Sequence, residues 1–168
     1  MRAIDTPDDI GAVVRIHFEI DRALTHIIET MVPNPSVLRH HYMSQRLSYL
    51  ESLGLPTDRL APARAINVLR NKFAHKEKEH IQAADIDELE RAIVNLLGRP
   101  IPSNFALRHK SFRAPPREWR YDTMSPKEKF CLLGFFSLSG IATIEHDFQR
   151  LAFICKPNPN YPVPHDSG

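Results

Sequence analysis

Cysteine is scarce in this chain of 168 residues, which carries only Cys131 and Cys155. Both lie in an apolar helical pattern, where thiols usually act as small core residues, and this usage fits a reducing cytosol. The chain also lacks long apolar runs, because its most apolar stretch, 130–144, is shorter than the about 20 residues that a membrane helix needs. The sequence does not open with a basic segment followed by an apolar run, so no signal peptide is expected. We therefore expect a cytoplasmic protein without a membrane span.

The chain also has no large excess of positive or negative charge. The 22 lysines and arginines are nearly balanced by 20 aspartates and glutamates, for a formal net charge of +2. This value is too small to indicate nucleic-acid binding by itself, so any basic surface must come from local clustering. The six glycines form no phosphate-binding loop, and neither an internal repeat nor a strand alternation is visible. The length and ordinary composition predict one domain over 1–155 and a flexible proline-rich tail over 156–168.

Helical spacing of apolar residues is abundant, and it predicts an all-α fold. Capping signals and prolines predict five helices, over about 7–31, 36–53, 62–79, 85–97 and 126–154. The first is expected to begin with Thr6 as its cap and Pro7 at its first position, and the third is expected to begin at Pro62. Short links between the first four predict an antiparallel four-helix bundle, to which the fifth adds a long C-terminal helix.

The end of the third helix concentrates several kinds of polar side chain in residues 69–75. We expect its buried face to consist of Ile66, Leu69 and Phe73. Arg70 and His75 then bound a polar arc that includes Asn71, and they lie about 140° apart around the helix and about 7.5 Å apart along it. At this separation they can line one cleft without bonding each other. Ala74 lies between them and would let a second chain approach closely.

This window resembles the signature of the HEPN superfamily (higher eukaryotes and prokaryotes nucleotide-binding domains), which is an arginine followed by Asn or Asp, three variable residues and a histidine. The surrounding helices are most similar to its mannitol operon repressor (MltR-like) branch, notably in the sequence SLGLP at 52–56, and the resemblance covers residues 8–97. It implies a HEPN-like helical bundle and a metal-independent endoribonuclease that cleaves RNA through 2′-hydroxyl attack, without a cofactor. It also implies a homodimer in which two motifs meet, and a role as a toxin or defence effector with an antitoxin partner.

The same resemblance leaves two other classes of protein open. One is a non-catalytic MltR-like transcriptional regulator or interaction module. The other is a substrate-binding helper of a separate nucleotidyltransferase. The motif fits all three, so the resemblance favours the fold more strongly than the activity.

The catalytic interpretation gives each motif residue a role. Arg70 would stabilise the charge on the phosphorane, because its planar guanidinium binds phosphate oxygens in a bidentate manner. His75 would act as base or acid, since imidazole titrates near neutral pH, and Asn71 would be a polar positioning residue. Asp21, at the buried edge of the first helix, is expected to pair with Arg70 and orient it. The structural alternative is that Arg70 and Asn71 hold the bundle together and His75 caps the helix end, while His17 is interpreted as a core histidine.

Residues 98–124 break the helical pattern with four prolines and are expected to form a long basic loop. Cations interleaved with aromatic side chains are typical of single-strand binding. The residues that we expect to contact RNA are Arg108, Lys110, Arg113, Arg117, Trp119 and Arg120. The alternative is that the aromatic side chains fix the loop to the bundle while its charges stay solvated.

Nine histidines raise the question of a metal site. His40 and His41 are adjacent and diverge on a helix, and the pair Glu77 and His80 lacks a second histidine-bearing helix at a recognisable spacing. No metal site is therefore expected.

Overall fold

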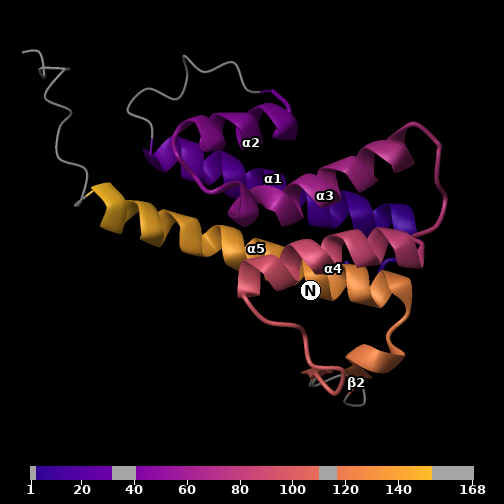
Figure 1. Ribbon diagram of the computed structural model, residues 1–168. Helices are drawn as coiled ribbons and strands as arrows, with labels where there is room; N and C mark the ends of the chain where they lie inside the picture. Colours follow the sequence, from indigo (N-terminus) through magenta and orange to yellow (C-terminus); the bar gives the residue numbers. More distant parts are fainter. Residues whose placement is uncertain (1–2, 32–40, 110–116, 153–168) are drawn as a thin grey trace, which may run out of the picture.

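The computed structural model describes residues 3–31, 41–109 and 117–152, and these are mostly helical (Figure 1). They form five α-helices, one 3-10 helix and one two-stranded sheet. In chain order the elements are α1 (Asp9–Met31), α2 (Met43–Ser52), α3 (Thr57–Ala74), α4 (Ala83–Leu97), β1 (Ala106–His109), β2 (Arg117–Arg120), η2 (Tyr121–Thr123) and α5 (Pro126–Ala152). The prediction of a mostly helical protein is confirmed, and the tail over 156–168 lies outside the described residues.

Helix α1 begins two residues later than predicted, because Asp8 rather than Thr6 caps it. The Asp8 carboxylate accepts a hydrogen bond from the Gly11 backbone N–H at 2.6 Å, which satisfies one of the donors that a helix start leaves free. The Thr6 hydroxyl instead donates to the Ala3 carbonyl at 2.7 Å. Threonine and aspartate are both good caps, so the sequence does not rank the two positions.

Helix α2 begins at Met43, well after the predicted start at residue 36. The backbone N–H groups of His41 and Tyr42 donate to the side-chain oxygen of Gln45, at 2.9 and 3.2 Å. A side chain three residues into a helix that reaches back to its start is a capping interaction, and it fixes the first turn here. Residues 36–40 of the predicted helix lie outside the described part of the chain.

Helix α3 begins at Thr57, so the prediction that Pro62 opens it is wrong. Pro62 lies inside the helix and is buried. Its ring nitrogen cannot donate the usual backbone bond to the carbonyl of Asp58, four residues earlier. Proline is much more common in the first turn than in the second, which is why the sequence pattern misplaces this start.

The core lies among α1, α3, α4 and α5, which contact one another around it, and α2 packs on α1 and α3. The largest fully buried side chains include Ile20, Leu24, Leu60, Ile66, Leu89, Ile93, Phe130, Leu133 and Ile141. Three of these belong to α5, so this helix is part of the core rather than an addition to a core built by the first four. Figure 1 shows α5 (orange to yellow) running along α1 and α4. The reason is composition, since the most apolar stretch of the sequence lies in α5 and is stabilised most by burial.

Two glycines allow α5 to approach its neighbours closely. A Cβ atom added at Gly134 would lie 2.6 Å from the branched Cγ2 of Ile16 on α1. One added at Gly140 would lie 2.6 Å from Cδ2 of Leu96 on α4, the far end of a flexible side chain. The first contact has little freedom to relax, because a β-branched side chain is stiff at χ1.

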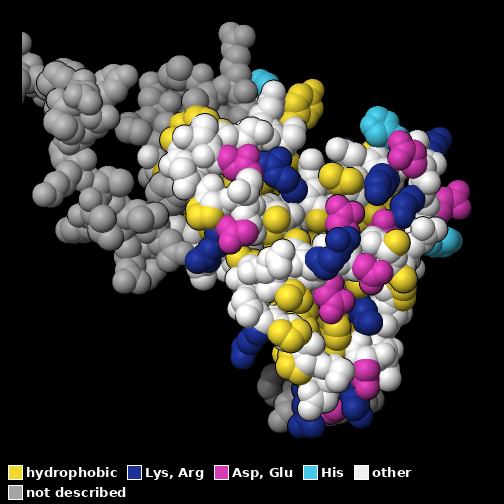
Figure 2. Space-filling model, in the orientation of Figure 1, with side chains coloured by type: hydrophobic (Ala, Val, Ile, Leu, Met, Phe, Trp, Pro, Cys, Tyr) yellow, Lys and Arg dark blue, Asp and Glu magenta, His cyan; other side chains and the backbone are white. Residues whose placement is uncertain are grey.

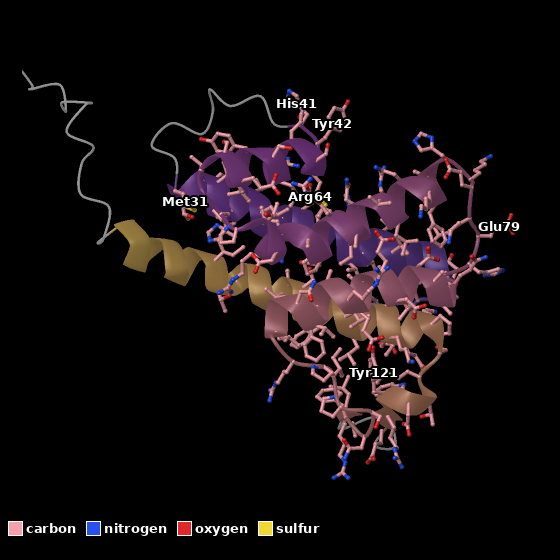
Figure 3. All side chains as sticks on the ribbon, in the orientation of Figure 1. Met31, His41, Tyr42, Arg64, Glu79 and Tyr121 are labelled. Carbon is pink, nitrogen blue, oxygen red and sulfur yellow. The ribbon has the colours of Figure 1, made fainter. Side chains whose placement is uncertain are left out.

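The region 98–124, predicted as an irregular loop, contains a β-hairpin. Strands β1 and β2 pair antiparallel, and Leu107 lies opposite Trp119. Trp119 is half-buried and packs with Phe105 and Phe136 against a small second core of Tyr121, Met124 and Leu132. Figure 3 shows Tyr121 between the hairpin and the helices. The residues that connect the two strands, 110–116, lie outside the described residues.

Candidate functional site

The motif residues lie on the solvent side of the last turn of α3. Ile66, Leu69 and Phe73 are buried, as predicted, with exposures of 0, 5 and 6%. Arg70, Asn71 and His75 are therefore all exposed. The Arg70 guanidinium donates to the Asn71 side-chain oxygen at 3.2 Å, so the structure brings these two side chains together.

The position of His75 is fixed by the way α3 ends. Its backbone N–H donates to the Asn71 carbonyl at 2.9 Å, so it is the cap residue of the helix. Lys76 takes a left-handed conformation (φ 58°), and the Lys76 and Glu77 N–H groups return to the Phe73 and Lys72 carbonyls. This is a Schellman ending, which normally favours glycine at the left-handed position. Within the described residues the imidazole of His75 makes no hydrogen bond, so the backbone alone positions it.

Asp21 does not pair with Arg70, which corrects the prediction. Its carboxylate accepts from Arg46 of α2 at 2.7 Å, with side-chain exposures of 28% for Asp21 and 13% for Arg46. A second ion pair joins Arg64 of α3 to Glu51 of α2, and Figure 3 shows Arg64 beside α2. Among the residues that the structure describes, Arg70 has no carboxylate partner. Its positive charge is therefore not neutralised within this part of the chain.

His17, which the sequence places among the core histidines, contacts the helix that carries the motif. It is half-buried on α1, and its Nε2 lies 3.2 Å from the Asn67 side-chain oxygen on α3. Burial is the main cause that lowers its pKa from 6.5; Arg70 and Arg46 add to this, whereas the Asn67 bond and Asp21 oppose it. We call His17, Asp21, Arg46, Asn67 and Arg70 the polar seam, since they join α1, α2 and α3. The polar side of α3 was visible in the sequence, but the helix that it faces was not.

An exposed apolar stripe runs along α1 beside the polar seam. Ile10, Val14 and Phe18 are 46, 49 and 60% exposed, and they repeat every four residues. Helical periodicity places them on the same flank of α1 as His17 and Asp21. Large apolar side chains in a row on a surface are typical of contacts with another molecule.

Two of the four arginines predicted to bind RNA, Arg108 and Arg120, have carboxylate partners in the described residues. Arg108 of β1 pairs with Glu118 of β2 at 2.7 Å, and both side chains are exposed. Arg120 lies 3.5 Å from Asp122. Figure 2 shows Lys and Arg intermixed with Asp and Glu on the visible face, where no large area has one sign of charge. These contacts reduce the positive potential that the sequence pattern suggested.

The other predicted RNA contacts divide into two groups. Trp119 packs into the second core, an arrangement that corresponds to the structural alternative for this residue. Lys110 and Arg113 lie outside the described residues. The structure describes only the backbone of Arg117, which lies opposite His109 in the strand register. The hairpin therefore contributes few free cations in the part of the chain that the structure describes.

Within 3–31, 41–109 and 117–152, no three or more His, Cys, Asp or Glu side chains gather where they could hold a metal ion. In these ranges the imidazole of His80 lies 3.7 Å from the Asp9 carboxylate, which makes a pair and not a group of three. None of the helices in the described ranges is both long enough and apolar enough to cross a membrane.

Comparisons with known proteins found no matching family model, no matching curated protein and no matching solved structure. The resemblance to the HEPN superfamily therefore rests on the motif Arg70, Asn71 and His75 and on the helical pattern around it. It stays a prediction.

Proposed function

We propose that this protein is a HEPN-like, metal-independent endoribonuclease. The observation that carries the proposal is the exposed guanidinium of Arg70, which bonds Asn71 and has no carboxylate partner among the described residues. An arginine in this state is available to an anionic ligand. A phosphodiester is one ligand that its planar fork can bind through two parallel hydrogen bonds.

The chemistry follows from the groups at this surface. The 2′-hydroxyl of RNA attacks the adjacent phosphorus once a base removes its proton, and the 5′-oxygen leaves when an acid protonates it. Arg70 stabilises the extra negative charge that develops between these events, which is where positioned cations contribute most to a rate. His75 supplies one of the two proton transfers, and Asn71 holds the guanidinium in place. A step of this kind needs no metal ion.

The proposal includes a homodimer in which the α1 and α3 surfaces of two copies meet. The apolar stripe of Ile10, Val14 and Phe18 supports it, because such a surface is stabilised by burial. In light scattering at micromolar concentration, the parent should be a dimer and Phe18→Glu a monomer. Leu97→Glu is a matched control, since Leu97 is 43% exposed on α4. A monomeric parent would contradict a shared site.

We also propose how the helices are arranged and where the protein acts. The four helices α1, α3, α4 and α5 would form the HEPN-like antiparallel bundle, and their mutual contacts support this. The setting would be the cytoplasm, where the protein would act on RNA as a toxin or defence effector held in check by an antitoxin partner.

Three single substitutions test the ribonuclease. His75→Ala and Arg70→Lys should each lower the cleavage rate at least about a hundredfold, because one removes a proton-transfer group and the other keeps charge but loses the fork. His26→Ala is the matched control, since His26 is exposed on α1 and lies outside the polar seam. Circular dichroism and melting temperature should match the parent in all three. Parent-like cleavage by folded His75→Ala would remove the enzyme claim.

A second candidate is a non-catalytic interaction module, either an MltR-like regulator or the helper of a nucleotidyltransferase. The observation that favours it is that the His75 imidazole makes no hydrogen bond within the described residues, whereas catalytic side chains are usually held by neighbours. In this case the purified protein would not cleave RNA. Phe18→Glu would then abolish binding to a protein partner.

A further inference from the structure

One nitrogen of His17 is committed to a hydrogen bond and the other is free. The side-chain oxygen of Asn67 can only accept, so the Nε2 atom 3.2 Å away must carry the ring proton. In the neutral imidazole this leaves the lone pair on Nδ1. Asn67 therefore selects the tautomer in which Nδ1 is a proton acceptor, as the second partner of an active-site histidine commonly does.

The free nitrogen is not among the fully buried polar atoms of the described residues. In the described part of the chain, the buried side-chain polar atoms without a hydrogen bond belong to Arg46, Glu51, Tyr121 and Ser137. Nδ1 of His17 also makes no bond there, yet it is not one of these buried atoms. It can therefore meet a molecule that approaches the seam between α1 and α3.

The charges around His17 come from all three helices of the seam. Asp21 lies on its own helix, Arg46 on α2 and Arg70 on α3. Burial together with the two arginines outweighs the opposing effects of the Asn67 bond and Asp21, so the pKa of His17 is lowered from 6.5. The lowered pKa favours the neutral form of the imidazole. A neutral histidine beside an arginine is suited to act as a base toward a phosphate-containing substrate.

His17 lies on the helix that faces α3, and its bonding partner Asn67 precedes Arg70 by three residues, which is about 4.5 Å along the helix axis and on the same face. His75 follows Arg70 by five residues, about 7.5 Å along the axis and about 140° around the helix. Asn67 and His75 are eight residues apart, about 12 Å along the axis. His17 and His75 therefore approach Arg70 from different sides, so we assign them different tasks.

We propose that His17 is a catalytic base of this site, acting through Nδ1 on an RNA phosphodiester held by Arg70. This inference rests on the proposed ribonuclease function. The 2′-hydroxyl proton passes to Nδ1, the 2′-oxygen bonds to phosphorus, and the bond from phosphorus to the 5′-oxygen breaks. The leaving 5′-oxygen takes its proton from the His75 imidazolium of the second copy. The products are a 2′,3′-cyclic phosphate and a 5′-hydroxyl.

Asn67→Asp is the sharpest test, because it keeps the acceptor for Nε2–H and adds a negative charge. A carboxylate at this distance raises a histidine pKa by about one unit or more. The acid limb of the kcat/KM profile should move to higher pH by the same amount. Histidine NMR on the same variant should give an equal rise in the pKa of His17. A merely structural His17 would leave the limb in place, and that result would overturn the proposal, as would an unchanged His17 pKa.

His17→Gln completes the experiment, with His26→Gln as the matched exposed control. Loss of a general base should lower kcat/KM by about 10²–10⁴, whereas the control should equal the parent. A folded His17→Gln protein with parental activity would refute this role alone and leave the ribonuclease standing. A parent without RNA cleavage would refute both. If circular dichroism finds His17→Gln unfolded, the Asn67→Asp profile decides.

Discussion

The ion pair between Asp21 and Arg46 gives a quantitative test of the polar seam. The pair is short, at 2.7 Å, and the Arg46 side chain is only 13% exposed. The Arg46 Nε atom is already buried without a partner. Asp21→Asn would remove the counter-charge and leave this guanidinium further uncompensated.

The expected cost lies between two limits. Exposed ion pairs contribute about 0.2–1 kcal/mol, and breaking a fully buried pair costs about 3–5 kcal/mol. Asp21 and Arg46 are partly buried, so Asp21→Asn should lower the free energy of unfolding by about 1.5–3 kcal/mol. Glu19→Gln is the control, because its partner Arg22 is 70% exposed and the change should cost less than about 0.5 kcal/mol.

A double-mutant cycle in urea identifies the partner. We expect a coupling energy of about 1–2 kcal/mol between Asp21→Asn and Arg46→Gln, and less than about 0.5 kcal/mol between Asp21→Asn and Arg70→Gln. The sequence alone predicts the opposite, since it pairs Asp21 with Arg70. Strong coupling to Arg70 and none to Arg46 would refute the described seam and would restore a counter-ion to the motif arginine.

Three further predictions concern packing and the hairpin. Gly134→Ala should lower the free energy of unfolding, measured in urea, by about 1–2 kcal/mol, because overpacking against the stiff Ile16 side chain exceeds the gain in helix propensity. Gly140→Ala should be neutral or stabilising, and equal effects of the two substitutions would contradict the described packing. Trp119→Ala should lower the unfolding free energy by about 1–3 kcal/mol without a selective loss of RNA affinity, and intact stability with weakened binding would indicate base stacking instead. Burial raises the pKa of the Cys131 thiol to about 11. In a Cys155→Ser variant, iodoacetamide at pH 8 should therefore leave native protein unmodified and modify protein unfolded in urea. Rapid modification of the native protein would show that the thiol is exposed.

The helices were predictable because their signals are local. The buried face of Ile66, Leu69 and Phe73 follows from spacing alone. The capping box at the start of α5 lies within four adjacent residues, where the Ser125 N–H and hydroxyl both donate to the Glu128 carboxylate at 2.8 Å. The helix starts were less accurate. Local signals compete there, as when two good caps stand two residues apart.

The hairpin escaped prediction because its signal is not local. Each four-residue strand carries one large apolar side chain, Leu107 or Trp119, so neither strand displays an alternating pattern. The two come opposite each other only when the strands pair. Cross-strand contacts of this kind stabilise a sheet but leave no periodic mark in the sequence.

The candidate site was predictable only where its features depend on local helical geometry. The exposure of Arg70, Asn71 and His75 follows from helical geometry, which the sequence contains. The partner of Asp21 depends on where α2 packs, and the role of His17 depends on Asn67 across the interface between two helices. Such contacts are set by tertiary packing, which spacing along one helix does not encode.

The central claim is tested most directly by incubating the purified parent protein with an RNA oligonucleotide in excess chelator. A matched oligonucleotide with 2′-deoxy sugars is the control, because it lacks the attacking hydroxyl. Our account predicts cleavage of the RNA with 2′,3′-cyclic phosphate ends, no cleavage of the control, and loss of the products in His75→Ala. Cleavage that requires an added divalent metal, or that proceeds equally on the 2′-deoxy control, would contradict it.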